Sequence, residues 1–391
     1  MDFNSTTPLD IKVIEAIKEV CVNMWANPSS SYKSGQCVKE TIDGSRQWVA
    51  KMINCDAEEI IFTSGGTEAN NWVIYSSVEE FNKNIRKPEG FSIPHIITTN
   101  IEHDSIRLIL EKLVMDGKIE VTFVSASKGF GFVSPKDVID SIRPNTVLIT
   151  IMLANNETGI LQPVGEISQL LAVVNADHSR HKILFHTDAA QAIGKLQVDV
   201  KDLAVDYLTI VGHKFYGPRI GALYRKRNQP LHPIFFGGGQ EGGFRPGTEN
   251  TPMIAGLGVA AEIVFHNVAL YEANMTSLRN YMEMKLTTEF EGLITINGVS
   301  SSIYGRLPNT ISVTFNDARL KGQETLRLCK KLRASVGAAC HSGQLKPSAV
   351  LIASGVEGNL ALSTIRLSLG RESQISDVET AVVELKLAVL Q

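Results

Sequence analysis

Short apolar runs, bounded by turn or polar residues, recur up to residue 226 and alternate with helix-like stretches. The strands that they predict are apolar on both faces, which indicates a mostly parallel sheet covered by helices on both sides. The runs are EIIFTSGG (59–66), HIITT (95–99), VTFVSA (121–126), TVLITIMLANN (146–156), ILFHTDAA (183–190), DYLTIVGH (206–213) and IGALYRK (220–226). Between them the sequence predicts helices over 67–81, 105–115, 164–175 and 190–194.

The pattern changes after residue 251. A long helical stretch from about Pro252 to Glu291 precedes two strand-like segments, 309–315 and 364–370, and a final helix that begins at Ile375. We therefore expect an α/β protein with two domains. These are a large domain over residues 12–255 and a smaller α/β domain formed by residues 1–11 and 256–391.

Composition and charge restrict the class of protein. The 391 residues carry 38 Lys and Arg against 41 Asp and Glu, which does not favour nucleic acid as a partner. The longest apolar runs fall short of the ~20 residues of a membrane helix, and MDFNSTTPLD lacks the features of a signal peptide. The five cysteines form neither a CxxC pair nor a zinc-ligand spacing. We expect a cytoplasmic protein without a metal, nucleic-acid or membrane partner.

Polar residues stand at or just after the carboxyl ends of the predicted strands. They are Ser64, His103, Asn155, Asp188 and His213. Parallel sheets bind their ligands at this edge, because the carboxyl ends of the strands meet there. The sequence therefore predicts that the site lies at the carboxyl edge of the large sheet.

Lys214 follows an apolar strand, in GHKFYG. Most lysines at strand ends are surface residues, but a desolvated lysine has a lowered pKa and can form a Schiff base. Asp188 closes another strand, in HTDAAQ, and Gln191 follows it. A buried carboxylate needs a cation, such as the pyridinium of pyridoxal phosphate, whose phenolic oxygen Gln191 is placed to reach. Asp188 as the N-cap of a helix is an equally good interpretation of the pattern.

The glycine pair in TSGGTEANN (63–71) leaves backbone N–H groups free at a helix start, where a phosphate binds well. Gly65, Gly66 and Thr67 are the candidates, although a plain turn between strand and helix has the same pattern. The stretch contains neither GxGxxG nor the Walker pattern, which disfavours a nicotinamide oxidoreductase. His103, in EHDSIR, either stacks on an aromatic cofactor or has an ordinary hydrogen-bonding role.

Two further residues near the C-terminus have the chemistry of a site. Cys340 lies among small residues in ASVGAACHSG (334–343), a setting that suits a nucleophilic thiol and equally a passive loop cysteine. Arg366, on the strand TIRLSLG, suits a carboxylate clamp or a surface salt bridge. One pyridoxal phosphate site explains the lysine, the aspartate, the glycine turn, the histidine, the thiol and the arginine together.

These motifs resemble the class V, fold-type I pyridoxal-phosphate enzymes, in particular the selenocysteine lyase and cysteine desulfurase family. The resemblance covers nearly the whole chain, in the ordered blocks SGGTEANN, EHDSIR, IMLANNETG, HTDAAQ, GHKFYGPRIGALY, RPGTEN, GAACHSG and IRLSLGR. It implies a fold-type I transferase architecture, pyridoxal 5'-phosphate as cofactor and an amino acid as substrate. The blocks resemble the animal-type selenocysteine lyases more than the bacterial desulfurases, and so imply that L-selenocysteine is converted to L-alanine and reduced selenium.

The resemblance also implies roles for individual residues. Lys214 forms the Schiff base and moves the proton of the substrate Cα, while Asp188 pairs with the ring nitrogen. The remaining implied roles are the phenolic oxygen for Gln191, ring stacking for His103, the phosphate for Gly66, Thr67 and His213, the substrate carboxylate for Asn156 and Arg366, and attack on or protonation of the leaving chalcogen for Cys340. Thr248 is implied to reach the cofactor of a partner subunit, which requires a homodimer.

Two positions separate this chain from the desulfurase pattern. Gly212 stands where desulfurases commonly have a serine whose hydroxyl binds the phosphate. Asp104 places an acid directly after the stacking histidine, where its charge raises the pKa of Cys340 and keeps it a proton donor, or simply favours a helix N-terminus.

Two other functions stay open at this point. A cysteine desulfurase would carry a persulfide on Cys340 and deliver sulfur to an acceptor protein for iron–sulfur assembly, and HSGQLKPSAVL resembles the long loop of such enzymes. A catalytically silent scaffold of the same fold would not need to bind pyridoxal phosphate. For the lyase, a selenium acceptor protein is a further expected partner.

Overall fold

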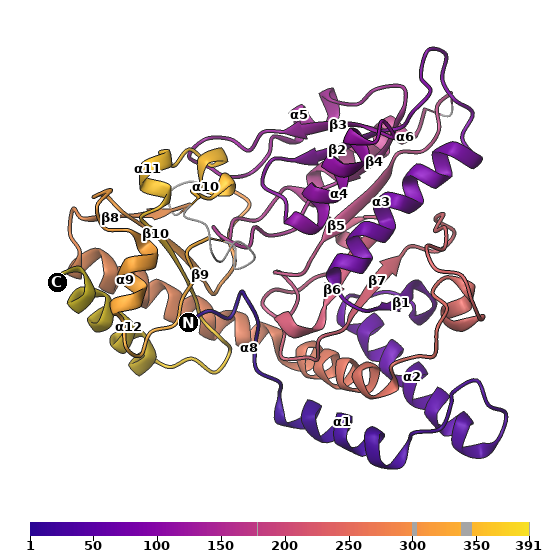
Figure 1. The fold of residues 1–391 in the computed structure, drawn as a ribbon, viewed down its shortest axis with the longest axis horizontal. Coiled ribbons are helices and arrows are strands. Elements are labelled where there is room, and N and C mark those ends of the chain that lie inside the picture. Colours follow the sequence, from indigo (N-terminus) through magenta and orange to yellow (C-terminus); the bar gives the residue numbers. More distant parts are fainter. Residues whose placement is uncertain (178, 299–302, 338–345, 391) are drawn as a thin grey trace.

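The computed structural model describes residues 1–177, 179–298, 303–337 and 346–390. The fold contains a seven-stranded sheet, a three-stranded sheet and a long helix, α8 (Thr251–Glu289), whose N-terminal half packs with the large sheet and whose C-terminal half packs with the small one (Figure 1). The strands of the large sheet, in spatial order, are β1 (Ile60–Thr63), β7 (Gly221–Arg225), β6 (Tyr207–Val211), β5 (Leu184–Asp188), β4 (Thr146–Thr150), β2 (His95–Thr99) and β3 (Glu120–Val124).

The large sheet is mostly parallel, as the sequence predicts. The strands β6, β5, β4, β2 and β3 run in one direction, and β7 alone runs against its two neighbours. A parallel return needs a long crossover, but only nine residues join β6 to β7, so β7 pairs with β6 in the antiparallel direction. The carboxyl ends of the parallel strands therefore meet at one edge.

Helices cover both faces of this sheet. On one face α3 (Gly66–Lys83) and α4 (Asp104–Met115) pack a core around Trp72 and Ile106. On the other face α2 (Lys33–Met52), α6 (Val164–Asn175) and α8 pack against strand residues that point the opposite way. The remaining helices around the sheet are α1 (Ile11–Asn23), α5 (Pro135–Asp140) and α7 (Val200–Leu203).

The predicted helix over 190–194 is wrong, because this segment is a series of turns. Ala192 and Ile193 both donate their N–H groups to the carbonyl of Ala189, and the chain then turns back at Gly194. Gly194 has φ +80°, and a Cβ there would collide with Phe215. The close approach of Phe215 favours a glycine with left-handed backbone, which stops a helix.

The small sheet is antiparallel and has the order β10 (Thr364–Ser368), β9 (Thr310–Phe315), β8 (Ile294–Asn297). The helices of this part of the chain are α9 (Gly322–Leu328), α10 (Ala349–Ala353), α11 (Gly358–Ala361) and α12 (Ile375–Val389). The strands β9 and β10 and the helix α12 confirm the predictions for these segments.

Residues 2–7 form a segment that we call the N-terminal strap. Asp2 pairs with Ser368 at the edge of β10 that faces away from β9, and Thr7 donates its N–H to the carbonyl of His213, just after β6. The strap therefore connects the small sheet to the carboxyl edge of the large sheet, and in Figure 1 it lies beside β9 and β10.

The helix α8 is the one helix in the described part of the chain that is long and apolar enough to cross a membrane, by length and composition alone. Half of its most apolar window is buried inside the fold, and it packs against α1, α2 and α12. These contacts are those of a core helix. The expected domain boundary at residues 255 and 256 falls inside α8 and stays a prediction.

Candidate active site

A cavity of about 210 Å³ opens at the carboxyl edge of the large sheet. Eight of the residues expected in the site line it, namely Gly66, Thr67, His103, Asn156, Asp188, Gln191, His213 and Lys214. The lining also includes residues that the sequence analysis did not single out, which are Asn70, Ser105, Met152, Ala154, Ala190 and Val211. The cavity therefore lies where the sequence analysis expects the site.

Asp188 is the last residue of β5 and is 8% exposed. Its carboxylate accepts hydrogen bonds from Asn70 Nδ2 at 2.8 Å and from the N–H of Ala190 at 2.9 Å. No helix begins here, so the alternative that Asp188 is an N-cap does not hold. Within the described residues the carboxylate has no ion-pair partner, and a buried carboxylate on a cavity wall suits a cationic ligand atom.

A chain of hydrogen bonds fixes the side chain of Asn70 that holds Asp188. The hydroxyl of Thr209 donates to Asn70 Oδ1 at 2.6 Å, and His186 Nε2 lies 3.0 Å from the same hydroxyl. Burial lowers the pKa of His186 to about 4, so the ring is neutral at pH 7. Since the hydroxyl of Thr209 is the donor to Asn70, it accepts from His186, and Thr150 lies 2.8 Å from the other ring nitrogen. Because Asn70 Oδ1 accepts from Thr209, the Nδ2 group of Asn70 faces Asp188.

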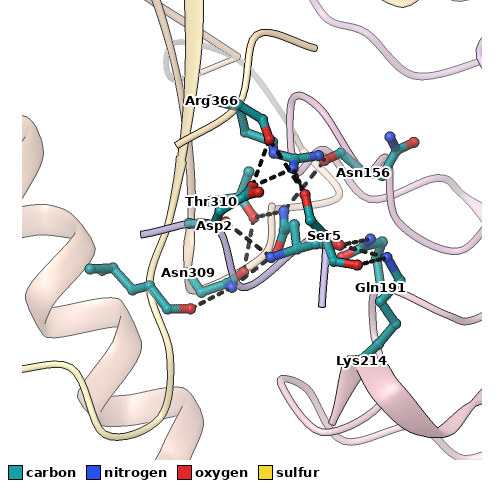
Figure 2. A network of polar contacts seen from close by, with 12 residues as sticks. Asp2, Ser5, Asn156, Gln191, Lys214, Asn309, Thr310 and Arg366 are labelled. Carbon is teal, nitrogen blue, oxygen red and sulfur yellow. Dashed lines mark hydrogen bonds and ion pairs between the residues drawn. The ribbon is translucent and has the colours of Figure 1, made fainter. Parts of the chain in front are cut away.

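Lys214 ends a short 3₁₀ turn, Gly212–Lys214, directly after β6. Its Nζ donates to the main-chain carbonyls of Asn4 at 2.7 Å and Ser5 at 2.8 Å (Figure 2). Gln191 Nε2 donates to the same carbonyl of Asn4 at 3.0 Å. The strap therefore positions both the amine expected to carry the cofactor and the amide expected to contact it.

The glycine turn before α3 forms another wall of the cavity. Gly66 and Thr67 are the first residues of α3, so their N–H groups belong to a helix N-terminus, which favours an anion. Gly66 has no room for a side chain, because a Cβ would lie 2.6 Å from Val211 Cγ2. His213 lines the same cavity, and its Nδ1 lies 3.0 Å from the hydroxyl of Thr6. Burial, with help from the charges of Lys214 and Arg219, lowers the pKa of His213 to about 4.

The expectation for Gly212 needs a correction. Gly212 does not line the cavity, and a Cβ there would lie 2.5 Å from the carbonyl oxygen of Pro218 and 3.0 Å from that of Ile220. A serine at this position is excluded by the backbone that packs against it. The side chain that faces the cavity from this strand end is Val211, one residue earlier.

His103 is the N-cap of α4, where its Nδ1 accepts a hydrogen bond from the N–H of Ser105 at 3.1 Å. This contact fixes the ring while the residue also lines the cavity. Asp104 opens α4 and forms an ion pair of 2.8 Å with Arg107, and it does not line the cavity. The helix start is enough to explain Asp104, and its role in specificity stays a prediction.

Asn156 and Arg366 lie together, but only Asn156 lines the cavity. Arg366 is 2% exposed, and its NH1 donates to the carbonyl of Asn156 at 2.9 Å. Its NH2 donates to Asp2 at 2.8 Å and to the hydroxyl of Ser5 at 2.7 Å, as Figure 2 shows. Arg366 is therefore a buried residue of β10 that grips the strap, and the expectation of a surface salt bridge is wrong.

Besides Asp104 and Arg366, two more predicted residues are not placed in the cavity. Thr248 is exposed and does not line it. Cys340 lies outside the described residues. The described residues on either side of that segment, Gly337 and Ser348, both approach Glu157: Ser348 donates to Glu157 Oε2 at 2.6 Å, and a Cβ at Gly337 would lie 3.2 Å from the same atom. Because Glu157 follows Asn156, both Gly337 and Ser348 lie near the wall of the cavity that Asn156 forms.

Comparison with known proteins decides the family. The profile of the family described as aminotransferase class-V matches residues 1–380. The chain belongs to this family. Members of the aminotransferase class-V family bind pyridoxal phosphate. The cavity fits this cofactor, since it combines a helix N-terminus, a lysine amine and a buried carboxylate that has no counter-ion among the described residues.

The relatives of this chain include proteins named selenocysteine lyase and proteins named cysteine desulfurase. It is 51% identical over 399 residues to the selenocysteine lyase of Xenopus tropicalis, with 99% of this chain and 92% of the relative covered. It is 50% identical over 408 residues to the selenocysteine lyase of Homo sapiens, covering 100% and 92%. The cysteine desulfurase IscS of Methanosarcina thermophila is 38% identical over 399 residues, covering 100% and 91%.

The solved structure of a NifS-like protein matches the class-V fold of this chain with a TM-score of 0.87 at 30% identity, covering 100% of this chain and 98% of the other. A structure described as SspA in complex with cysteine matches with a TM-score of 0.77 at 33% identity, covering 94% and 97%. The expected fold-type I architecture is therefore confirmed.

Proposed function

We propose that this protein is an L-selenocysteine lyase that uses pyridoxal 5'-phosphate. The carbon–selenium bond of the substrate breaks and a proton takes the place of selenium at Cβ, so that Cβ becomes the methyl group of L-alanine, while the selenol loses its own proton. Selenium leaves in the formal zero-valent state, and a thiol reductant then supplies two electrons and two protons to give hydrogen selenide. The relatives named selenocysteine lyase, at 49–51% identity over nearly the full chain, support this substrate.

One structural observation carries the proposal: Asp188, buried and without a counter-ion in the described part of the chain, lines the same cavity as the Lys214 amine. When bound, pyridoxal phosphate supplies an electron sink for the carbanion at Cα, and Asp188 keeps its ring nitrogen protonated. Lys214 would hold the cofactor and move the proton between Cα and its own Nζ. His103 would cover one face of the ring, and Gly66, Thr67 and His213 would hold the phosphate.

Asn156 is placed to bind the substrate from the wall of the cavity next to Arg366. Its main-chain carbonyl accepts from Arg366, while its side-chain amide forms no hydrogen bond with any described residue. Among the described residues the amide has no partner and is available to the substrate carboxylate, and the guanidinium of Arg366 contacts the main chain of the same residue. We keep Cys340 as the thiol that attacks or protonates the leaving selenium.

Cysteine desulfurase is the second candidate, because relatives with that name are 36–38% identical over nearly the whole chain. The test is the rate of L-alanine formation from L-selenocysteine and from L-cysteine, each at saturating concentration with the same dithiol. We expect faster turnover of selenocysteine. Equal turnover of cysteine would overturn the lyase assignment, and Lys214→Ala, which cannot form the Schiff base, is the control for alanine released without the enzyme.

We also propose a two-fold homodimer in which Thr248 of the partner subunit completes the phosphate site. Thr248 is exposed here, and the same segment displays Phe235 and Phe236, which are 47% and 90% exposed. Exposed aromatic side chains of this kind are typical of a protein interface. Light scattering of the holoenzyme at micromolar concentration measures whether it is a dimer. Thr248→Ala should weaken cofactor binding without changing the mass of the dimer. A monomer that binds the cofactor fully would contradict the proposal.

A further inference from the structure

A second lysine lies next to the site and has no part in the proposed reaction. Lys195 is 4% exposed, and its Nζ donates to Gln191 Oε1 at 2.7 Å and to Asn4 Oδ1 at 2.9 Å. Both partners are amide oxygens, and no carboxylate pairs with this amine in the described chain. A buried lysine is costly to retain without a counter-ion, so its contacts call for a reason.

Lys195 belongs to the same turn as the two residues expected to hold the cofactor ring. The turn begins after Asp188, continues through Gln191 and ends with Lys195 beyond the left-handed Gly194. Because Gly194 packs on Phe215, the residue after Lys214, this turn is fixed against the loop of the catalytic lysine.

The contacts of Lys195 determine the orientation of the side-chain amide of Gln191. A glutamine side chain can turn by 180° and exchange its oxygen and nitrogen, and each orientation offers the cavity a different group. The amine of Lys195 can only donate here, so the atom of Gln191 that faces it must be Oε1. The Nε2 group then faces Asn4, to whose carbonyl it donates one N–H at 3.0 Å. The second N–H of this group has no acceptor among the described residues, and Gln191 lines the cavity.

We propose that Lys195 is a positioning residue that fixes the amide of Gln191 with an N–H group directed into the cavity, where it donates to the phenolic oxygen of pyridoxal phosphate. Asn4 is the second anchor, because its side-chain oxygen accepts from Lys195 while its main-chain oxygen accepts from Gln191 and Lys214. The carbonyl of Asn4 thus ties the amide and the catalytic amine to one point, as Figure 2 shows for Gln191 and Lys214.

Burial of Lys195, together with the positive charges of Lys214 and Arg366, holds its pKa well below the ordinary value for a lysine. A neutral amine could still donate to both amide oxygens, but it also has a lone pair that can accept, so it is the protonated form of Lys195 that fixes the orientation of Gln191. The inference depends on the cofactor of the family and not on the substrate, so it can fail while the lyase assignment stands, and the reverse.

The test is a pH titration of the visible absorption band of the holoenzyme, recorded without any amino acid substrate. A hydrogen bond donated to the phenolic oxygen makes this oxygen less basic. The proton that it shares with the Lys214 nitrogen is then lost more easily, so the pKa of the chromophore is lower. Lys195→Met removes the donor and is close in volume to lysine. It should raise the pKa of the chromophore by about one unit, the effect of losing one hydrogen bond to a charged group.

A double-mutant cycle separates positioning from a direct charge effect. Gln191→Met should raise the same pKa by a similar amount, and adding Lys195→Met to it should give no further shift, because Lys195 acts through Gln191. Lys182→Met, at a lysine whose side chain is 44% exposed and pairs with Asp206 away from the cavity, is the control and should titrate like the wild type. Wild-type titration in Lys195→Met, or fully additive shifts in the double variant, would overturn the proposal.

Lys195→Gln guards the test against a folding defect in the methionine variant. Its shorter amide can face Gln191 with either nitrogen or oxygen, so it no longer fixes the orientation, and a smaller upward shift is expected. If this variant binds the cofactor and titrates like the wild type, Lys195 has only a structural role. Lys195→Met leaves the side-chain oxygens of Gln191 and Asn4 without this donor, whereas Lys195→Gln can still donate to one of them, so the second variant tests the proposal even if the first does not fold.

Discussion

Arg366 donates a hydrogen bond of 2.8 Å to the carboxylate of Asp2, so the arginine expected near the substrate carboxylate already holds a carboxylate of its own chain. A substrate carboxylate bound at Asn156 would share this guanidinium with Asp2. Asp2→Asn keeps the hydrogen bond but removes the competing charge, so it should lower KM for the amino acid by about three- to tenfold. Steady-state kinetics at low and high salt check this, and an unchanged KM would mean that Arg366 does not act on the substrate.

Arg366→Lys provides the complementary change. A lysine keeps the charge but loses the planar fork that contacts Asn156, Asp2 and Ser5 at once. We expect KM to rise on the order of tenfold or more, with little change in cofactor absorbance, since Arg366 does not line the cavity. A loss of cofactor instead would indicate that the main role of Arg366 is to hold the strap.

Cys340 lies outside the described residues, and the described residues Gly337 and Ser348 both approach Glu157, which follows the cavity residue Asn156. Cys340→Ala should therefore keep the cofactor colour but lose alanine and selenide formation by about a hundredfold or more, the contribution of a general acid. Cys21→Ala, at an exposed free cysteine on α1, is the control. Full activity of Cys340→Ala would mean that the thiol is only a loop residue.

Val211 presents a methyl group at the turn where the phosphate is expected. Val211→Thr has nearly the same shape and adds a hydroxyl, which should lower the dissociation constant of pyridoxal phosphate by about three- to tenfold. In the cofactor-free protein the same hydroxyl has no partner, so the variant should melt at a lower temperature than the wild type. Val211→Ala, which loses packing without adding a donor, should weaken binding, and tighter binding in both variants would contradict this explanation.

Glu102 is buried next to the site, and its Oε1 accepts from the hydroxyl of Thr99 at 2.6 Å and from the N–H of Met152 at 3.1 Å. Burial, with a smaller contribution from the charge of Asp188, raises its pKa to about 8 from the ordinary value of 4.5. The folded protein therefore holds a proton that the unfolded chain releases between these two values, so this group makes stability fall as the pH rises through that window.

Glu102→Gln keeps the shape and both hydrogen bonds but cannot titrate. Its free energy of unfolding relative to the wild type should therefore increase steadily from pH 4.5 to about pH 8 and then level off. Urea unfolding of the cofactor-free proteins at several pH values measures this difference, in which the other titrating groups cancel. A difference that does not depend on pH would mean that Glu102 is ionised in the folded protein.

The sequence was sufficient where structure follows from local pattern. The strands of the large sheet and the helices α3, α4, α6 and α8 lie close to their expected positions, because each buries an apolar run or stripe in the core. The strand β8 was missed because its residues are only partly buried and show no clear alternation. The segment 190–194 was misassigned because the collision between a Cβ at Gly194 and Phe215 is a contact between distant residues.

The residues that support the site could not be found in this way. Lys195 and Asn4 are 191 residues apart, and neither lies in a pattern that points to the other. The strap is short and polar, and its conformation depends on β10 and on the loop of Lys214. Asn70 was within a motif already noted, but its role depends on Asp188, 118 residues later. Residues with catalytic or binding side chains were therefore predictable from their type and their position after a strand. The residues that position these side chains were not.

The strap has a consequence for the synthesis of the protein. Asp2 is synthesised at the start of translation and Arg366 near its end, and domains generally begin to fold while the chain is still growing. The large sheet can assemble first, but the strap has no edge to dock on until β10 has emerged. A nascent chain that ends before β10 would therefore contain the folded large sheet but an active site without its strap. Chalcogen release would then begin only when translation is nearly complete.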